Sequence, residues 1–162
     1  MTSPKPCPLY DGSRYVIADS IGHQLFTVMT SMRREVEARM AELDLTDAQW
    51  KPLMLLKNGR ASTAIEIARE MDVDAGAVTR MVDRLEAKGM IERVRSDEDR
   101  RVVHLRLTRS GEATAAQVPH ILAAVNNDFL RGFSETEWKQ LRKLLTRMAA
   151  NGATLQTERA EA

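Results

Sequence analysis

The sequence predicts a mainly α-helical chain with a small β-hairpin. Apolar side chains recur at three- and four-residue steps over most of the 162 residues, which is the period of an amphipathic helix. Residues 91–107 change to a two-residue alternation, which is the period of a strand. Aromatic residues make up only 4% of the chain against nine methionines, a composition that favours aliphatic helix packing over a sandwich of sheets.

The N-terminal part predicts an arm followed by a long helix. Residues 1–14 are expected to be extended, because three prolines and Gly12 disfavour helix and sheet. From Ile17 to Leu43 the apolar residues keep the helical period, which predicts one amphipathic helix. A single chain of this size has difficulty covering such a stripe, so we expect a partner helix from a second copy.

Two capping boxes mark the helices that come next. Thr46 with Gln49 opens one helix, and Thr63 with Glu66 opens a shorter one. After a polar break, the apolar spacing predicts a longer helix over residues 76–88, closed by glycine. A short helix, a tight turn and a longer helix form a helix-turn-helix pattern.

A hairpin is expected directly after this pattern. Residues 91–95 suit a strand, and Val103, Leu105 and Leu107 alternate with polar residues beyond a polar turn. A hairpin attached to a helix-turn-helix is a wing. We therefore expect residues 46–108 to form a winged helix-turn-helix domain.

The C-terminal part predicts two further helices. Thr108 suits the cap of the first, and Pro119 within it predicts a kink. A third capping box, Ser134 with Glu137, opens the last helix, which is expected to give way to a polar tail after Asn151.

Charge and cysteine content exclude several classes of protein. There are 24 basic and 23 acidic residues, so binding to nucleic acid would require the basic side chains to be gathered on one surface. The single Cys7 excludes a disulfide framework within one chain, and the three histidines share no short ligand spacing. We expect no metal site and no cofactor.

Targeting and catalytic motifs are also missing from the sequence. No apolar run is long enough to span a bilayer, and the first residues lack the apolar region of a secretory signal. We expect a soluble, cytoplasmic protein without a membrane partner. No phosphate loop, metalloprotease motif or nucleophile elbow is present, so an enzyme is not expected.

The outward face of the helix at 76–88 carries residue types that read DNA. Small residues at a helix N-terminus let its backbone approach a phosphate. Arginine makes paired hydrogen bonds to guanine, and threonine contacts the thymine methyl group. The residues concerned are Gly76, Ala77, Thr79, Arg80 and Arg84. The alternative is a solvated helix face with a surface ion pair between these arginines and Asp83.

The predicted hairpin gathers arginines around an acidic tip. Arginine at a wing tip suits the narrow, negative minor groove, and an adjacent aspartate such as Asp99 can hold the guanidinium in place. The alternative is an ordinary charged hairpin. The arginines are Arg93, Arg95, Arg100, Arg101, Arg106 and Arg109.

Two runs of sequence carry a resemblance to a known family. Residues 73–93 read VDAGAVTRMVDRLEAKGMIER, and residues 99–101 and 105–108 read DRR and LRLT, with Gly111 beyond them. These runs resemble the MarR family of winged-helix transcriptional regulators, and the order of helices agrees over residues 15–150.

The resemblance implies a homodimer that binds palindromic operator DNA, most simply as a repressor. The recognition helix is then 76–88, and Arg101, next to Arg100, enters the minor groove. Asp74 and Asp99 match acidic positions that orient that arginine. Ser62 and Thr63 match the start of the preceding helix, where phosphate contacts are common. The implied organisation is an arm (1–14), a helical dimerisation region (15–45 and 109–152), the winged domain (46–108) and a polar tail (153–162).

The resemblance also implies a small aromatic effector, a carboxylate or phenol, in a cleft beside the dimer helices. Relatives that bind salicylate have basic residues where this chain has Thr27 and Thr30. An anion would therefore need another partner, such as Arg14, His23 or a residue of the second subunit. His23 and Trp50 together suit a planar ring. The alternative is that His23 lies in the interface and Trp50 in the core.

Two other functions remain open from the sequence. One is a winged-helix adaptor that contacts proteins and not DNA. It gives no reason for Arg80, Arg84 and Arg101 to share one exposed face. The other is a repressor that senses oxidation through Cys7, although the proline-rich run PKPCPLY around it gives no sign of a cation or helix N-terminus held against the thiol to lower its pKa.

Overall fold

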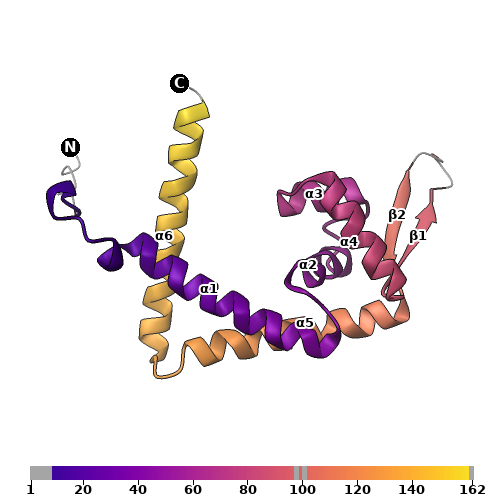
Figure 1. Ribbon diagram of the computed structural model, residues 1–162, viewed down its shortest axis with the longest axis horizontal. Coiled ribbons are helices and arrows are strands. Elements are labelled where there is room, and N and C mark those ends of the chain that lie inside the picture. Colours follow the sequence, from indigo (N-terminus) through magenta and orange to yellow (C-terminus); the bar gives the residue numbers. More distant parts are fainter. Residues whose placement is uncertain (1–8, 97–98, 100–101, 161–162) are drawn as a thin grey trace. The chain divides into compact units, whose positions relative to one another are not determined.

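The computed structural model describes residues 9–96, 99 and 102–160 (Figure 1). The chain consists of two compact units, residues 1–125 and 126–162. The described residues form six α-helices and two strands, which confirms the predicted fold class. Their order is α1 (Ile21–Met40), α2 (Asp47–Lys57), α3 (Ala64–Met71), α4 (Ala75–Ala87), β1 (Ile91–Arg95), β2 (Val103–Leu107), α5 (Arg109–Phe129) and α6 (Glu135–Ala160).

The first long helix starts later than the apolar pattern predicts. Ser20 has an extended backbone, and its side chain accepts a hydrogen bond from the backbone N–H of His23, so α1 begins at Ile21. Residues Ile17–Asp19 form a separate 3-10 turn. A second such turn, Gly12–Arg14, replaces part of the expected extended arm because the Asp11 carboxylate caps it. Residues 1–8, with Cys7, lie outside the described residues.

The helix-turn-helix is built as its caps predict. The Thr46 N–H donates to the Gln49 side chain over 3.1 Å, and Thr63 and Glu66 cap each other at the start of α3. The helix α2 continues without interruption through the buried Pro52. The helix α4 begins at Ala75, one residue earlier than expected, because Asp74 takes the N-cap position.

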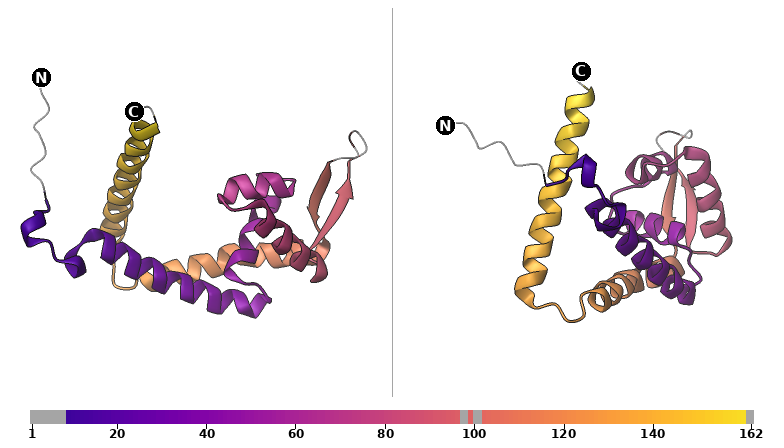
Figure 2. Two further views of the ribbon diagram at one scale, coloured as in Figure 1. Left: turned by 45° about the horizontal axis from the view of Figure 1, so that its top comes forward. Right: turned by 60° about the vertical axis from the view of Figure 1, so that its left-hand side comes forward.

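The core of the first unit joins the end of α1 to the winged domain and α5. Figure 2 shows the two strands as a ribbon beside α4 and the start of α5. The strands pair in an antiparallel register that places Arg93 opposite Leu105, which confirms the predicted hairpin. The fully buried larger side chains of this core are Met40, Leu53, Ile67, Val78, Val82, Leu85 and Val118.

Thr108 and Gly111 fasten the start of α5 to the turn between α4 and β1. The Thr108 hydroxyl donates to the Gly89 carbonyl over 2.6 Å and accepts from the Gly111 N–H over 3.1 Å. The Thr108 N–H donates to the Met90 carbonyl over 3.1 Å. Gly111 itself is buried against the backbone of Met90. The predicted cap of α5 is therefore confirmed, and it also positions the first strand of the wing.

The last helix is longer than expected. Ser134 and Glu137 form the predicted capping box, with the Ser134 N–H 2.8 Å from the Glu137 carboxylate. The helix continues to Ala160, so the polar tail predicted over 153–162 is wrong for the described part. Residues 150–160 contain no proline, so no residue of this segment removes a backbone donor from the helix. The Thr154 and Thr157 hydroxyls donate to carbonyls one turn earlier.

Two kinds of feature are absent from the described residues. None of their helices is both long and apolar enough to cross a membrane. Among the same residues, no group of three or more His, Cys, Asp or Glu side chains is placed to hold a metal ion.

Candidate nucleic-acid interface

The N-terminus of α4 is closed by an acidic cap. The Asp74 carboxylate accepts from the Ala77 N–H over 3.1 Å. A Cβ on Gly76 would lie 2.9 Å from that carboxylate oxygen, so the Asp74 side chain would have to shift to admit it. Glycine at this position therefore accommodates the cap of its own helix. The expectation that Gly76 and Ala77 open this end to a phosphate stays a prediction, and the capping carboxylate opposes it electrostatically.

One turn further along α4, the predicted DNA-reading side chains lie on the surface. Thr79, Arg80 and Arg84 are all exposed. The Thr79 hydroxyl donates to the Ala75 carbonyl over 3.0 Å, so its hydrogen is already used within the helix. Neither Arg80 nor Arg84 forms an ion pair with any residue that the structure describes, and the alternative of a surface pair with Asp83 is not observed.

Both arginines also line a small cavity. This cavity has a volume of about 210 Å³ and lies between α4 and the first turn of α2. The side chains of Arg80 and Arg84 thus project beside a second element of the winged domain. The other lining residues are Thr46, Ala48, Gln49, Ala77 and Met81.

Arg93 does not have the DNA-contacting role that the sequence suggested for the hairpin arginines. Its Nη2 atom lies 2.6 Å from Asp83 Oδ1, and its Nη1 atom donates to Glu86. The hydrogen bond to Asp83, supported by Glu86, raises the pKa of the Arg93 guanidinium above its ordinary value. Arg93 therefore pairs with two carboxylates of α4, and its charge is not available to DNA.

The start of α3 is also occupied by a carboxylate. Glu66 accepts from the Ser62 N–H over 2.6 Å, the Ser62 hydroxyl over 3.0 Å and the Thr63 N–H over 3.1 Å. These bonds, the Ser62 N–H first among them, lower the pKa of Glu66. Because these donors are satisfied inside the chain, phosphate contacts by Ser62 and Thr63 stay a prediction. The capping-box pattern was the signal for this arrangement.

Two arginines that the sequence places at the wing tip, Arg100 and Arg101, lie outside the described residues. At the base of the turn, the Ser96 N–H donates to the Val102 carbonyl, and the Asp99 N–H lies 3.3 Å from the Ser96 hydroxyl. The orientation of Arg101 by Asp74 and Asp99 therefore remains a prediction.

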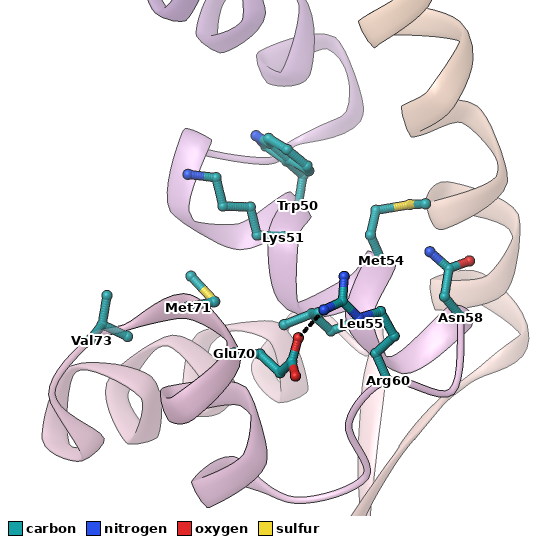
Figure 3. A pocket seen from close by; sticks show the side chains of 9 residues that line it. All are labelled: Trp50, Lys51, Met54, Leu55, Asn58, Arg60, Glu70, Met71 and Val73. Carbon is teal, nitrogen blue, oxygen red and sulfur yellow. Dashed lines mark hydrogen bonds and ion pairs between the residues drawn. The ribbon is translucent and has the colours of Figure 1, made fainter. Parts of the chain in front are cut away.

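Trp50 lines a larger cavity between α2 and α3 (Figure 3). Its volume is about 460 Å³. The indole N–H donates to Asp47 over 3.2 Å, and the Lys51 ammonium lies 5.6 Å from the centroid of the indole ring. An ion pair between Arg60 and Glu70, 2.5 Å long, borders the cavity. The remaining lining residues are Met54, Leu55, Asn58, Met71 and Val73.

The other predicted effector residues do not line this cavity. Arg14, His23 and Thr27 are exposed, and the two latter residues lie in the first half of α1. His23 precedes the end of α1 by roughly 25 Å of helix, while α2 follows that end (Figure 1). Within one chain, His23 and Trp50 are therefore not brought together. Lys51 was missed because nothing in the sequence shows which exposed lysine faces a cavity.

Comparisons with known proteins identify the family. Residues 45–103 match the model of the MarR family. The chain is 30% identical over 129 residues to the multiple antibiotic resistance protein MarR of Escherichia coli strain K12, covering 79% of this chain and 90% of that protein. The chain belongs to the MarR family.

Solved structures of MarR share its architecture. The reduced form of E. coli MarR matches with a TM-score of 0.72 and 29% identity, over 80% of this chain and 96% of that one. A mutant E. coli MarR complexed with operator DNA matches with a TM-score of 0.69 and 29% identity, over 79% and 92% of the two chains. This MarR-family protein is a winged-helix transcriptional regulator.

Proposed function

We propose that this MarR-family regulator binds double-stranded operator DNA through α4 in the major groove and the hairpin on the adjacent minor groove. The observation that carries the proposal is the exposure of Arg80 and Arg84 on α4, with no ion pair to any described residue. Unpaired guanidinium groups on a recognition helix suit guanine edges and phosphates. The complex of E. coli MarR with operator DNA supports the same assignment.

The functional unit is a homodimer on a pseudo-palindrome, acting as a repressor. Large apolar side chains near the N-terminus of α1 are exposed in the single chain, among them Phe26 at 69% and Met29 at 62%. Apolar surface of this extent is normally covered by a partner, and a second copy would also supply the second recognition helix. The two half-sites should lie about one helical turn, roughly 10 base pairs, apart.

Replacing Arg101 with alanine should weaken DNA binding at every sequence tested. The lost charge in the minor groove should also reduce the salt slope of the binding constant by about one unit. Titrations of selected duplex DNA at several salt concentrations measure both effects. Arg131→Ala is the matched control, because Arg131 pairs with Asp128 in the second unit. If the wild-type protein forms no salt-sensitive complex with DNA, the proposed function is wrong. If the Arg101 variant binds like wild type, Arg101 does not contact the minor groove.

We also propose that a small aromatic carboxylate or phenol releases the DNA by binding at the Trp50 cavity. This cavity has apolar walls, an indole face and the Lys51 ammonium at its side. Such a combination holds a planar ring and neutralises an acid group. Arg14, His23 and Thr27 would take part only if the second subunit brings them to the cavity.

Lys51→Gln should reduce the response to aromatic carboxylates while leaving ligand-free DNA binding intact. A thermal-shift screen of aromatic acids, followed by DNA titration in their presence, measures the response. Lys57→Gln is the control on the same helix, because Lys57 pairs with Glu112 and does not line the cavity. The effector proposal is wrong if no compound both raises the melting temperature and lowers DNA affinity.

A further inference from the structure

Acidic and basic residues alternate along the exposed part of α4. Asp83 lies three residues after Arg80, a spacing at which side chains on a helix meet and pair. Glu86 follows within the next turn. If Asp83 turned toward Arg80 and Glu86 stayed unpaired, the recognition helix would present little net positive charge to DNA.

The structure shows a different pairing. Arg93 on β1 contacts both carboxylates, with Nη2 on Asp83 at 2.6 Å and Nη1 on Glu86. Its guanidinium is a planar fork, so one cation can hold two acceptors in fixed directions. Only 33% of the Arg93 side chain is exposed, against 55% for Asp83, so the arginine is the better anchored partner.

Strand β1 fixes Arg93 in this place. Arg93 stands opposite Leu105 in the hairpin. The Leu105 N–H donates to the Ser62 carbonyl over 2.7 Å, and the buried Leu105 side chain belongs to the core. The outer edge of β2 is therefore tied to the start of the helix-turn-helix, and this contact holds the hairpin whose other strand carries Arg93.

We propose that Arg93 is a positioning residue for DNA recognition: it holds Asp83 away from Arg80, and it neutralises Glu86 on the same helix. Among the described residues, neither Arg80 nor Arg84 then has an ion-pair partner that DNA would have to displace. An arginine paired within its own helix would first have to break that pair, and a carboxylate near a phosphate repels it. This inference rests on the proposed function.

The test is a rescue experiment on a duplex selected by the wild-type protein. Arg93→Met should lower affinity by roughly 3- to 30-fold, which lies within the range of coupling between neighbouring groups in contact. The triple variant Asp83→Asn, Glu86→Gln, Arg93→Met should recover wild-type affinity to within about twofold, because the competing carboxylates are gone. A second triple variant, Asp128→Asn, Glu135→Gln, Arg93→Met, removes equal charge from the second unit and should stay as weak as Arg93→Met.

Each other result overturns the proposal. If Arg93→Met binds like wild type, the carboxylates do not compete for the recognition arginines. If the first triple variant stays weak, Arg93 acts by contacting DNA or by holding the hairpin. If both triple variants recover equally, the gain reflects total charge only. Asp83→Asn, Glu86→Gln with Arg93 intact provides a test that does not depend on Arg93→Met folding, and weaker binding by it also contradicts the proposal. A wild-type protein that selects no DNA would contradict the proposed function itself.

Discussion

Replacing Gly111 with alanine should destabilise the first unit by about 3 kcal/mol, the upper range for a steric clash in a packed interior. A Cβ at this position would lie 1.8 Å from the Met90 carbonyl oxygen and 2.8 Å from its carbon. Both atoms belong to the backbone, so no change of rotamer relieves the clash. Either α5 or the turn before β1 must move. Urea unfolding monitored by circular dichroism measures the loss.

The control for this substitution is Gly152→Ala. Gly152 lies inside α6, and nothing stands within 4 Å of the Cβ that alanine would add. The same added methyl should therefore stabilise the helix by up to about 1 kcal/mol. Equal unfolding midpoints for the Gly111 variant and wild type would show that the contact between α5 and Met90 is looser than described.

The same clash links stability to function. The Met90 carbonyl that would be displaced also accepts the Thr108 N–H, at the junction of the recognition helix, the hairpin and α5. A variant that folds by shifting this junction should hold the hairpin differently against α4. Some loss of DNA affinity should therefore remain even where the protein is fully folded.

The elements that the sequence predicted well are those specified by neighbouring residues. Thr63 and Glu66 form a cap from two positions three residues apart, and the pattern alone indicates it. The start of α1 was missed for the opposite reason. Ile17 fits the apolar period, but the Ser20 cap begins the helix afterwards, and hydrophobic spacing does not report a cap that interrupts it.

The candidate site follows the same rule. The exposure of Arg80 and Arg84 could be predicted, because the opposite face of their own helix is apolar. The role of Arg93 could not, since its partners lie seven and ten residues away on another element. The ion pair that borders the Trp50 cavity likewise links two elements: Arg60 lies in the loop between α2 and α3, and Glu70 lies on α3. Such pairs depend on how elements pack, which periodicity does not specify.

Replacing Arg80 with alanine should relax the base preference of the regulator at one or two positions of each half-site. An arginine that bonds guanine through two hydrogen bonds discriminates against other bases by about 1–3 kcal/mol. Affinity for the preferred duplex should fall by that amount, while affinity for duplexes already substituted there should change little. Titrations against a set of duplexes, each with one base pair changed, measure the pattern.

Two variants show whether this effect belongs to Arg80. Arg69→Ala removes an exposed arginine from α3, outside the recognition helix, and should leave base preferences unchanged. Arg84→Ala removes the next cation along α4 and should alter a different base position or none. A uniform loss of affinity for all duplexes by Arg80→Ala would instead assign Arg80 to a phosphate.

The local geometry favours base reading by Arg80. Its Nη1 atom lies 3.8 Å from the position that a Cβ on Gly76 would occupy, so the side chain runs toward the N-terminal turn of α4. Recognition helices of this class read bases with their N-terminal residues. Asp74 already places a carboxylate at this end, which opposes a phosphate there but tolerates the amino group of a base. A guanidinium in this position therefore meets base edges more readily than the DNA backbone.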